Sequence, residues 1–291
     1  MKAIVLLFLA INIHLSVFSQ KDTLFTGGSI CQSGELELVF ADEFNGNKLD
    51  LTKWVTYYPY TDNGSDQCEF CRTHGAEGQV YLDNNIVVSD SSLKLIARRQ
   101  DVEWFKLKRP YSSGMIHSCT NFGMGRYEIR CKLPYGMGFW PAFWMFGDKA
   151  VEIDVFEIGC QEPRRQHMGI ISWKNHKTFD KRKNGRIDFS KDFHVFAMEW
   201  DQNFVRFFLD GKETWQVSLM QPRSGKVMRN CNPRKGRYRL QPAFPTEGEK
   251  LSIIANLAIG NETTPFTKTP VAATIFPNHM EIDWIRVYKR K

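Results

Sequence analysis

The chain has 291 residues, of which 42% are hydrophobic and 24% are charged, and 39 lysines and arginines outnumber 32 aspartates and glutamates. This composition is typical of a globular protein and excludes a collagen-like fibre, a disordered protein and a multi-span membrane protein. The formal net charge of +7 suits an anionic polymer as partner, but a solvated lysine-rich surface explains it as well. No motif indicates nucleic-acid binding.

The first 19 residues contain the longest apolar run of the sequence. Lys2 precedes apolar residues over 3–18, and small residues at Val17 and Ser19 occupy the positions that a signal peptidase reads. Two polar residues interrupt the run, which leaves too little hydrocarbon length for a stable membrane anchor. We therefore expect a signal peptide over 1–19, and a secreted or periplasmic protein. Residues 20–291 contain no linker or repeat, so we expect one domain there, and a monomer.

Short runs of β-branched and aromatic residues between turn residues predict an all-β protein. The expected strands, in chain order, are 35–40, 85–89, 93–98, 126–133, 142–146, 151–158, 168–173, 194–200, 204–209, 251–257 and 280–288. Turns at 201–203 and at Asp210-Gly211 predict two successive hairpins. Residues 220–249 are rich in Arg, Lys, Pro and Gly and predict a long surface loop. Such strands should form a β-sandwich.

Seven cysteines follow the apolar run, and an exported protein can pair them as disulfides. Cys68 and Cys71 form a C-x-x-C, but no second such pair and no histidine pair at ligand spacing completes a zinc site. We therefore expect structural disulfides. At least one of the seven stays unpaired in a monomer, and the sequence leaves the pairing open.

Three carboxylates interrupt an apolar strand in the segment VEIDVFEI, at Glu152, Asp154 and Glu157. A buried carboxylate without a partner costs on the order of several kcal/mol, so stability alone does not explain them. The apolar neighbours argue against three solvated side chains on an exposed strand. Glu152 and Asp154 share one face of a regular strand, whereas Glu157 points to the other. One extra residue between Asp154 and Glu157, a β-bulge, would turn all three to the same side.

Two glutamates on one face with an aspartate between them suit a retaining glycoside hydrolase. In this hypothesis Glu152 is the nucleophile and Glu157 is the acid/base, with a pKa raised by burial and by its negative neighbours. Asp154 would orient Glu152. The two glutamate carboxyl groups must then approach to roughly 5 to 5.5 Å across the substrate.

The segment EIDVFE, preceded by GFWPAFWMFG, resembles the ExDxxE signature of glycoside hydrolase family 16. ADEFNGNKLDLTKW, FHVFAMEWDQNFVRFFLDGK and MEIDWIRVYK also resemble segments of that family, in order. The resemblance implies a concanavalin-like jelly-roll sandwich of two antiparallel sheets with a cleft on the concave sheet. It also implies the three catalytic roles given above for the carboxylates.

The bulged branch of the family is associated with laminarinases, agarases, porphyranases and carrageenases. Val151 stands where laminarinase-like members usually have glycine, and LAIGNETTPF lacks a second glycine and a tryptophan common there. Two substrates therefore remain open, a β-1,3-glucan such as laminarin and an algal galactan, sulfated or not.

Aromatic and planar polar side chains bind sugars, and several lie near the carboxylates. We expect Trp140, Trp144 and Trp173 to contact substrate, although simple packing would also explain Trp144. His167 stands where the family often has a histidine near the acid, and it could equally be a structural histidine. Four nearby cations could recognise sulfate or form a solvated edge: Arg164, Arg165, Lys174 and Lys177.

The resemblance also implies a structural calcium ion, held by Asp283 of the last strand and by oxygens near the N-terminal strand. Asp283 could instead be a plain surface residue. No cofactor is expected for catalysis. The sequence thus predicts a secreted, endo-acting retaining hydrolase of β-linked polysaccharide. A non-catalytic lectin-like module and a transglycosylase that uses the same carboxylates are the alternatives.

Overall fold

The computed structural model describes residues 22–25, 29, 31, 34–58, 66–75, 77–222, 231–246 and 248–291. The predicted signal peptide over 1–19 lies outside the described residues. Within the described ranges the regular structure consists of twenty strands and one short 3-10 helix, η1 (Asp83–Asn85). None of the helices described there is long and apolar enough to span a membrane.

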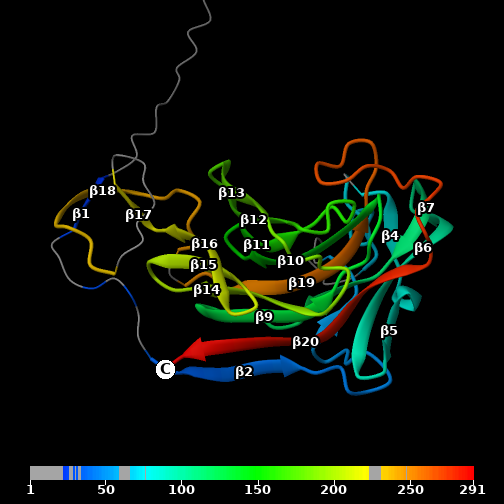
Figure 1. Ribbon diagram of the computed structural model, residues 1–291, viewed down its shortest axis with the longest axis horizontal. Helices are drawn as coiled ribbons and strands as arrows, with labels where there is room; N and C mark the ends of the chain where they lie inside the picture. Colours follow the sequence, from blue (N-terminus) through cyan, green and yellow to red (C-terminus); the bar gives the residue numbers. More distant parts are fainter. Residues whose placement is uncertain are drawn as a thin grey trace, which may run out of the picture.

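Two sheets stack face to face (Figure 1). The smaller sheet has seven strands, in the order β13 (Lys177–Asn184), β12 (Arg165–Ser172), β11 (Val151–Glu157), β10 (Phe139–Gly147), β19 (Leu251–Ile259), β8 (Met115–Ser118) and β3 (Trp54–Val55). The predicted carboxylate strand, β11, therefore has a hydrogen-bonded neighbour on each side, β12 and β10. Pairing with two strands fixes the register of β11.

The larger sheet packs against the inner face of the first. Its order is β16 (Lys212–Ser218), β15 (Phe204–Leu209), β14 (His194–Trp200), β9 (Gly125–Lys132), β20 (Asn278–Arg290), β6 (Ser92–Trp104), β7 (Leu107–Ser113) and β4 (Gln79–Tyr81), with β2 (Leu36–Asp42) beside β20 and β5 (Ile86–Ser89) beside β6. The pair β4–β7 is parallel, which departs from the predicted purely antiparallel arrangement. The predicted jelly-roll sandwich is otherwise confirmed.

The core lies between the sheets and follows from alternation along the strands. In β9 the residues Tyr127, Ile129 and Cys131 are fully buried, and the residues between them are partly exposed. Phe156 of the seven-stranded sheet contacts Phe196 of the ten-stranded sheet, with ring centroids 4.5 Å apart. Burying each such side chain contributes about 1.5–3 kcal/mol, so these contacts hold the two sheets together.

Both predicted hairpins are confirmed, since β14 pairs with β15 and β15 with β16. The prediction missed the short strands β3, β4 and β8 and also β7 and β13. The sequence of β13, KTFDKRKN, has no apolar alternation. An edge strand needs little burial and often carries charges, so periodicity does not reveal it. The prediction of a loop over 220–249 was partly wrong, because β17 (Met220–Gln221) and β18 (Gly236–Leu240) lie there and form a small sheet with β1 (Asp22–Phe25).

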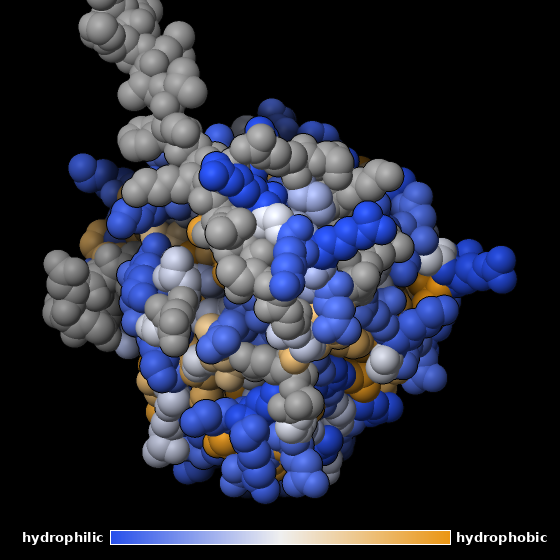
Figure 2. Space-filling model, turned by 90° about the vertical axis from the view of Figure 1, so that its left-hand side faces the viewer, coloured by the Kyte–Doolittle hydropathy of each residue, from blue (hydrophilic) through white to orange (hydrophobic). Residues whose placement is uncertain are grey.

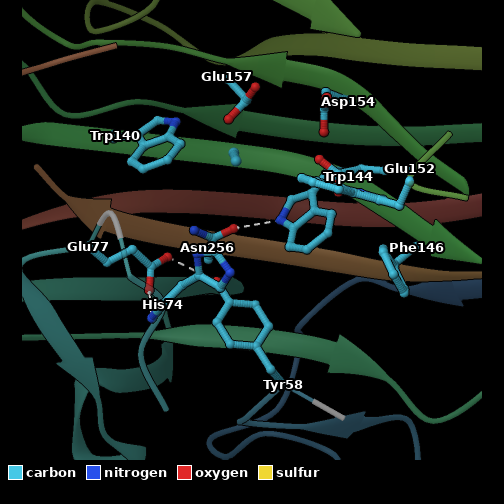
Figure 3. A pocket seen from close by; sticks show the side chains of 12 residues that line it. Tyr58, His74, Glu77, Trp140, Trp144, Phe146, Glu152, Asp154, Glu157 and Asn256 are labelled. Atoms are coloured by element: carbon cyan, nitrogen blue, oxygen red, sulfur yellow. Dashed lines mark hydrogen bonds between the residues drawn. The ribbon is translucent and has the colours of Figure 1, made fainter. Parts of the chain in front are cut away.

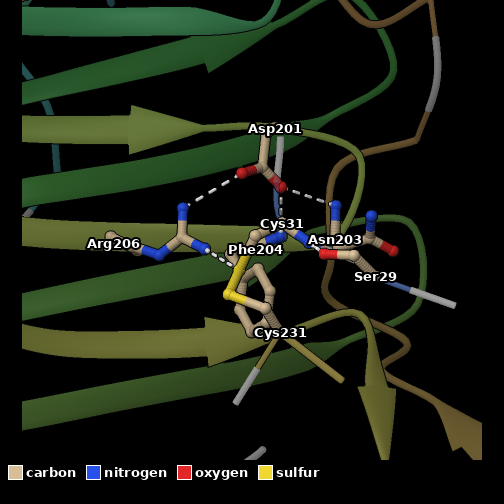
Figure 4. Close-up of a disulfide and its surroundings, with 7 residues drawn as sticks. All are labelled: Ser29, Cys31, Asp201, Asn203, Phe204, Arg206 and Cys231. Carbon is tan, nitrogen blue, oxygen red and sulfur yellow. Dashed lines mark hydrogen bonds and ion pairs between the residues drawn. A yellow bond between two sulfur atoms is a disulfide. The ribbon is translucent and has the colours of Figure 1, made fainter. Parts of the chain in front are cut away.

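Two disulfides confirm the structural use of cysteine. Cys68 bonds to Cys71, and Cys31 bonds to Cys231 across 200 residues (Figure 4). Arg206 of β15 lies beside the second bond and pairs with Asp201 at 3.0 Å. The contact of Arg206 with Cys31 thus connects this disulfide, which lies next to the three-stranded sheet, with the sandwich. The molecular face on that side is covered mainly by hydrophilic side chains (Figure 2).

Candidate active site

The predicted β-bulge lies in β11. Asp154 pairs with Gly169 of β12 and Glu157 pairs with His167, so β11 advances three residues where β12 advances two. The register with β10 shifts at the same place and leaves Val155 as the extra residue. Its carbonyl oxygen accepts a hydrogen bond of 3.0 Å from the side chain of Gln166, which is 2% exposed. A buried hydrogen bond thus satisfies the group that the bulge removes from the ladder.

Because of the bulge, all three carboxylates face the same cavity on the outer side of the seven-stranded sheet (Figure 3). The cavity has a volume of about 350 Å³. Its wall contains the three predicted tryptophans together with residues from β10, β19 and the segment before β4. The lining residues are Tyr58, His74, Glu77, Trp140, Ala142, Trp144, Phe146, Glu152, Asp154, Glu157, Trp173 and Asn256.

Glu152 is held by two neighbours. Trp173 donates a hydrogen bond of 2.8 Å from Nε1 to the Glu152 carboxylate, while its half-exposed ring stays open to the cavity. Burial raises the pKa of Glu152, whereas the hydrogen bonds from Trp173 and Asp154 lower it. These donors favour the ionised form that a nucleophile needs.

Asp154 lies beneath the cavity floor and is 3% exposed. Burial and the charges of Glu152 and Glu157 hold the pKa of Asp154 well above its ordinary value. Its space depends on Gly169 across the ladder, because a Cβ atom there would come within 2.6 Å of the Asp154 carboxylate. A protonated Asp154 can donate to Glu152, which fits the predicted orienting role.

Glu157 keeps its proton at neutral pH. Burial first and the charge of Glu152 second raise the pKa of Glu157 to about 8, and the indole of Trp140 opposes this. Figure 3 shows the ring nitrogen of Trp140, which is buried, turned toward Glu157. Burial outweighs the donors at Glu152 and leaves its pKa above the ordinary value, but the donors oppose that rise, whereas Glu157 is the stronger proton holder. A carboxylate that accepts hydrogen bonds thus lies beside a carboxylic acid, which is the pairing that acid-assisted nucleophilic displacement requires.

A second polar network forms the opposite wall, and the sequence analysis missed it. Glu77 accepts hydrogen bonds from Tyr58 at 3.0 Å and from Tyr81 at 2.9 Å, and burial raises the pKa of Glu77. Asn256 donates to Tyr81 at 2.9 Å and accepts from Trp144 Nε1 at 2.8 Å (Figure 3). This chain fixes the indole of Trp144. Asn256 could have been found, since it is the one amide in the run LSIIANLAI, which is apolar apart from Ser252 and Asn256.

The segment with the C-x-x-C supports this wall. The guanidinium of Arg72 is 6% exposed and pairs with Asp66 at 2.6 Å and with Asp83 at 2.9 Å. It also donates to the carbonyl of Tyr81 at 3.2 Å. Together with the Cys68–Cys71 bond, these contacts fix the stretch that carries His74 and Glu77 into the cavity.

His167 does not line the cavity. The register places it beside Glu157, but its ring stands edge-on against Phe266, with centroids 4.8 Å apart. Phe266 in turn packs on Trp140 at 5.3 Å. Burial and the nearby cations Arg182 and Arg165 lower the pKa of His167 to about 4, so the ring is neutral. These contacts favour a supporting role behind the cavity wall over direct substrate binding.

The calcium predicted at Asp283 does not fit the residues around it. The Asp283 carboxylate forms an ion pair with Arg130, and Arg130 and Lys132 both lie over the ring of Phe193. Two cations at this place disfavour a divalent metal ion. Across the described part of the chain, no group of three or more His, Cys, Asp or Glu side chains could hold a metal. Asp283 is better explained as the partner of Arg130.

A jelly-roll sandwich with a carboxylate trio under three tryptophans defines a glycoside hydrolase. The model of the family described as glycosyl hydrolases family 16 matches residues 75–235, more than half of the chain. The protein belongs to this family, whose members are O-glycosyl hydrolases.

Curated relatives and solved structures agree with this assignment. Glucan endo-1,3-beta-glucosidase A1 of Niallia circulans is 29% identical over 283 residues, which cover 88% of this chain and 38% of that protein. A keratan-sulfate endo-1,4-beta-galactosidase of Sphingobacterium multivorum is 24% identical over 60% of this chain and 42% of its own length. The chain thus spans less than half of these two relatives. The catalytic domain of an endo-1,3-beta-glucanase (laminarinase) from Thermotoga petrophila RKU-1 matches with a TM-score of 0.71 and 26% identity, over 89% of this chain and 100% of that one.

Proposed function

We propose that the protein is an endo-acting hydrolase of β-linked polysaccharide that cleaves with retention of configuration. One observation carries the proposal. The bulge at Val155 brings Glu157 to the face of Glu152, and burial keeps the proton on Glu157 while Trp173 supports the charge on Glu152. An open cavity with tryptophans on its wall is suited to the interior of a long sugar chain.

In the first step the Glu152 carboxylate attacks the anomeric carbon, and Glu157 gives its proton to the leaving glycosidic oxygen. A covalent glycosyl ester on Glu152 results. Glu157, now ionised, takes a proton from water, which attacks the same carbon and releases Glu152. Asp154 keeps its hydrogen bond to Glu152 and holds the carboxylate in its attacking orientation.

A β-1,3-glucan is the substrate that we favour. A curated relative and a matching solved structure carry glucan-specific names, and the cavity wall around Trp144 contains Tyr58 and Asn256 but no Lys or Arg among the described residues. Neutral sugars are bound by such aromatic and amide groups.

A sulfated galactan is the second candidate, favoured by the cationic edge of the seven-stranded sheet. Strand β13 and the ends of β12 carry an excess of basic side chains: Arg164, Arg165, Lys174, Lys177, Lys181, Arg182 and Lys183. Arg165 is already paired with Glu162 at 2.7 Å, which leaves the others for an anion. The name of the Sphingobacterium relative includes keratan sulfate.

The decisive assay measures new reducing ends from laminarin, mixed-linkage glucan, agarose, porphyran and carrageenans. Glu152→Gln and Glu157→Gln should both lose activity, while Glu213→Gln, which changes an exposed carboxylate on β16, should retain it. Nuclear magnetic resonance of the fresh product should show the retained anomer. Inversion, or full activity in either active-site variant, would refute the mechanism.

The same panel separates the alternative functions. Binding of one polymer without cleavage would indicate a lectin-like module. Transfer of label to an acceptor sugar in place of hydrolysis would indicate a transglycosylase.

Export is also a proposal, supported by the apolar run over residues 1–19. If the full chain is expressed in a bacterial host, mass spectrometry of the exported protein should find Gln20 as the first residue. Gel filtration of that mature protein should give the size of a monomer. Retention of the intact N-terminus on the membrane would contradict the signal peptide.

A further inference from the structure

The short turn that joins β10 to β11 is strained. It covers residues 147–150 and closes with a hydrogen bond of 3.0 Å from the amide of Ala150 to the carbonyl of Gly147. Ala150 has a φ angle of +60°, in the left-handed region that residues other than glycine rarely adopt. Such a conformation persists only where the surrounding structure holds it. Contacts from other segments must therefore fix this turn.

The turn lies next to the proposed nucleophile in two ways. Ala150 precedes Glu152 by two residues in the chain. The carbonyl oxygen of Ala150 also accepts a hydrogen bond of 2.9 Å from the backbone amide of Trp173. Trp173 in turn donates from Nε1 to the Glu152 carboxylate at 2.8 Å. The position of the turn therefore sets both the backbone of Glu152 and the indole that supports its charge.

Glu249, in the segment before β19, contacts the turn directly. Its Oε1 atom accepts a hydrogen bond of 2.9 Å from the backbone amide of Lys149. The residue is only 1% exposed, and its second carboxyl oxygen, Oε2, is buried without a hydrogen-bond partner in the described structure. Burial also raises the pKa of Glu249. A buried carboxyl group with an unsatisfied oxygen is costly, so stability alone does not explain a glutamate at this place.

The turn is shaped to accept this carboxyl group. A Cβ atom on Gly147 would come within 2.1 Å of Glu249 Oε1, so a glycine is needed there for the contact to form. A second hydrogen bond joins the same two segments, from the amide of Asp148 to the carbonyl of Lys250, and it is longer, at 3.3 Å. Glu249 thus makes the shorter of the two bonds that tie the turn to the segment before β19.

We propose that Glu249 is a positioning residue for the reaction, which holds the turn over 147–150 in place so that Trp173 and Glu152 keep their hydrogen-bonded arrangement. Glu249 is not among the residues that line the cavity, so it acts through the turn and not on the substrate. The inference rests on the proposed hydrolysis. It adds a determinant of kcat that lies outside the cavity.

The first test removes the acceptor oxygen. Glu249→Leu keeps a similar volume, and on laminarin it should lower kcat by about tenfold or more while KM changes by less than about threefold, because the cavity wall itself is unaltered. Glu249→Gln keeps an oxygen that can accept from Lys149 and should retain the wild-type kcat. Glu213→Leu, which changes an exposed glutamate on β16, is the matched control and should change neither constant.

The pH profile separates positioning from a general loss of structure. The hydrogen bond from Trp173 lowers the pKa of Glu152, so an indole that has moved away should let this pKa rise. The acid limb of the kcat/KM profile of Glu249→Leu should then lie at higher pH than in the wild type. In a Trp173→Phe background the donor is already gone, and Glu249→Leu should shift the limb no further.

The strained residue offers a rescue. Glycine adopts a positive φ angle without steric cost, so Ala150→Gly should keep the shape of the turn after its support is lost. Adding Ala150→Gly to Glu249→Leu should therefore recover most of the lost kcat and return the acid limb toward its wild-type position. Urea unfolding shows that each variant is folded under the assay conditions. If Glu249→Leu does not fold, Glu249→Asp, whose side chain is shorter by one methylene group, makes the same test.

A spectroscopic test does not depend on catalysis. The indole NH resonance of Trp173 can be identified in nuclear magnetic resonance spectra by its absence from Trp173→Phe. In Glu249→Leu this proton should exchange with water about tenfold faster or more, because its hydrogen bond to Glu152 is weakened, whereas Glu249→Gln should match the wild type.

These outcomes distinguish the two proposals. If the wild type cleaves no polysaccharide of the panel but the Trp173 indole responds to Glu249→Leu, the hydrolase proposal fails and the positioning contact stands. If the wild type cleaves laminarin and a folded Glu249→Leu keeps its kcat, acid limb and indole exchange, the hydrolase stands and the role of Glu249 is refuted. A loss of kcat with an unmoved limb and indole, or one that Ala150→Gly does not recover, would also overturn the proposal.

Discussion

Replacing Glu157 with glutamine should stabilise the folded protein at alkaline pH, and the gain should vanish in acid. An exposed glutamate ionises near pH 4.5, whereas burial and the charge of Glu152 raise the pKa of Glu157 to about 8. Between these values the folded state binds a proton that the unfolded state has released. Stability of the wild type therefore falls as the pH rises through this window. Glutamine has nearly the same shape and no charge, so it removes this dependence.

The size of the effect follows from the two pKa values. Each unit of difference corresponds to roughly 1.4 kcal/mol, so the shift from 4.5 to about 8 sets an upper limit of about 5 kcal/mol. Asp154 and Glu152 ionise in the same cavity and take part of the penalty. We expect Glu157→Gln to exceed the wild type by on the order of 2–4 kcal/mol at about pH 8 and by nearly zero at about pH 4.

Urea unfolding of both proteins across this pH range, with the disulfides intact, measures the difference. Glu213→Gln, which changes an exposed glutamate, should show no such pH-dependent difference. A constant offset between Glu157→Gln and the wild type at every pH, or a wild type that becomes the more stable protein as the pH rises, would refute the assignment of Glu157 as a buried, protonated acid.

Three further substitutions test the support of the carboxylates. Gly169→Ala places a Cβ within 2.6 Å of the Asp154 carboxylate, and steady-state kinetics should show kcat reduced more than about tenfold in a folded protein. Trp173→Phe removes the donor that lowers the pKa of Glu152, so the acid limb of the kcat/KM profile should move to higher pH; an unmoved limb would contradict this. Gln166→Leu leaves the carbonyl of the bulged residue Val155 without its hydrogen-bond donor. The free energy of unfolding in urea should fall by about 1–3 kcal/mol, and kcat should fall as well. Unchanged stability and kcat would show that the bulge does not depend on this hydrogen bond.

The sequence revealed the strand with the three carboxylates because the evidence for it is local. Glu152, Asp154 and Glu157 stand out against apolar neighbours, and the parity of their spacing requires one extra residue, which the structure places at Val155. Strands with one face in the core, such as β9, were also found from local evidence, because their side chains alternate between buried and exposed positions. Strand β13 escaped because an exposed edge imposes no alternation on its side chains.

Only the folded chain decided which distant residues meet. The indole of Trp144 is fixed by Asn256, 112 residues away, and Cys31 bonds to Cys231 across 200 residues; neither pairing leaves a local pattern. The family resemblance likewise indicated a metal ligand at Asp283, whereas in the folded chain its carboxylate pairs with Arg130. Periodicity and spacing therefore determined the strands with alternating side chains, the bulge and the shared face of the three carboxylates. The protonation of those carboxylates and the opposite wall of the cavity depend on burial and on contacts between remote segments, which exist only once the two sheets have packed.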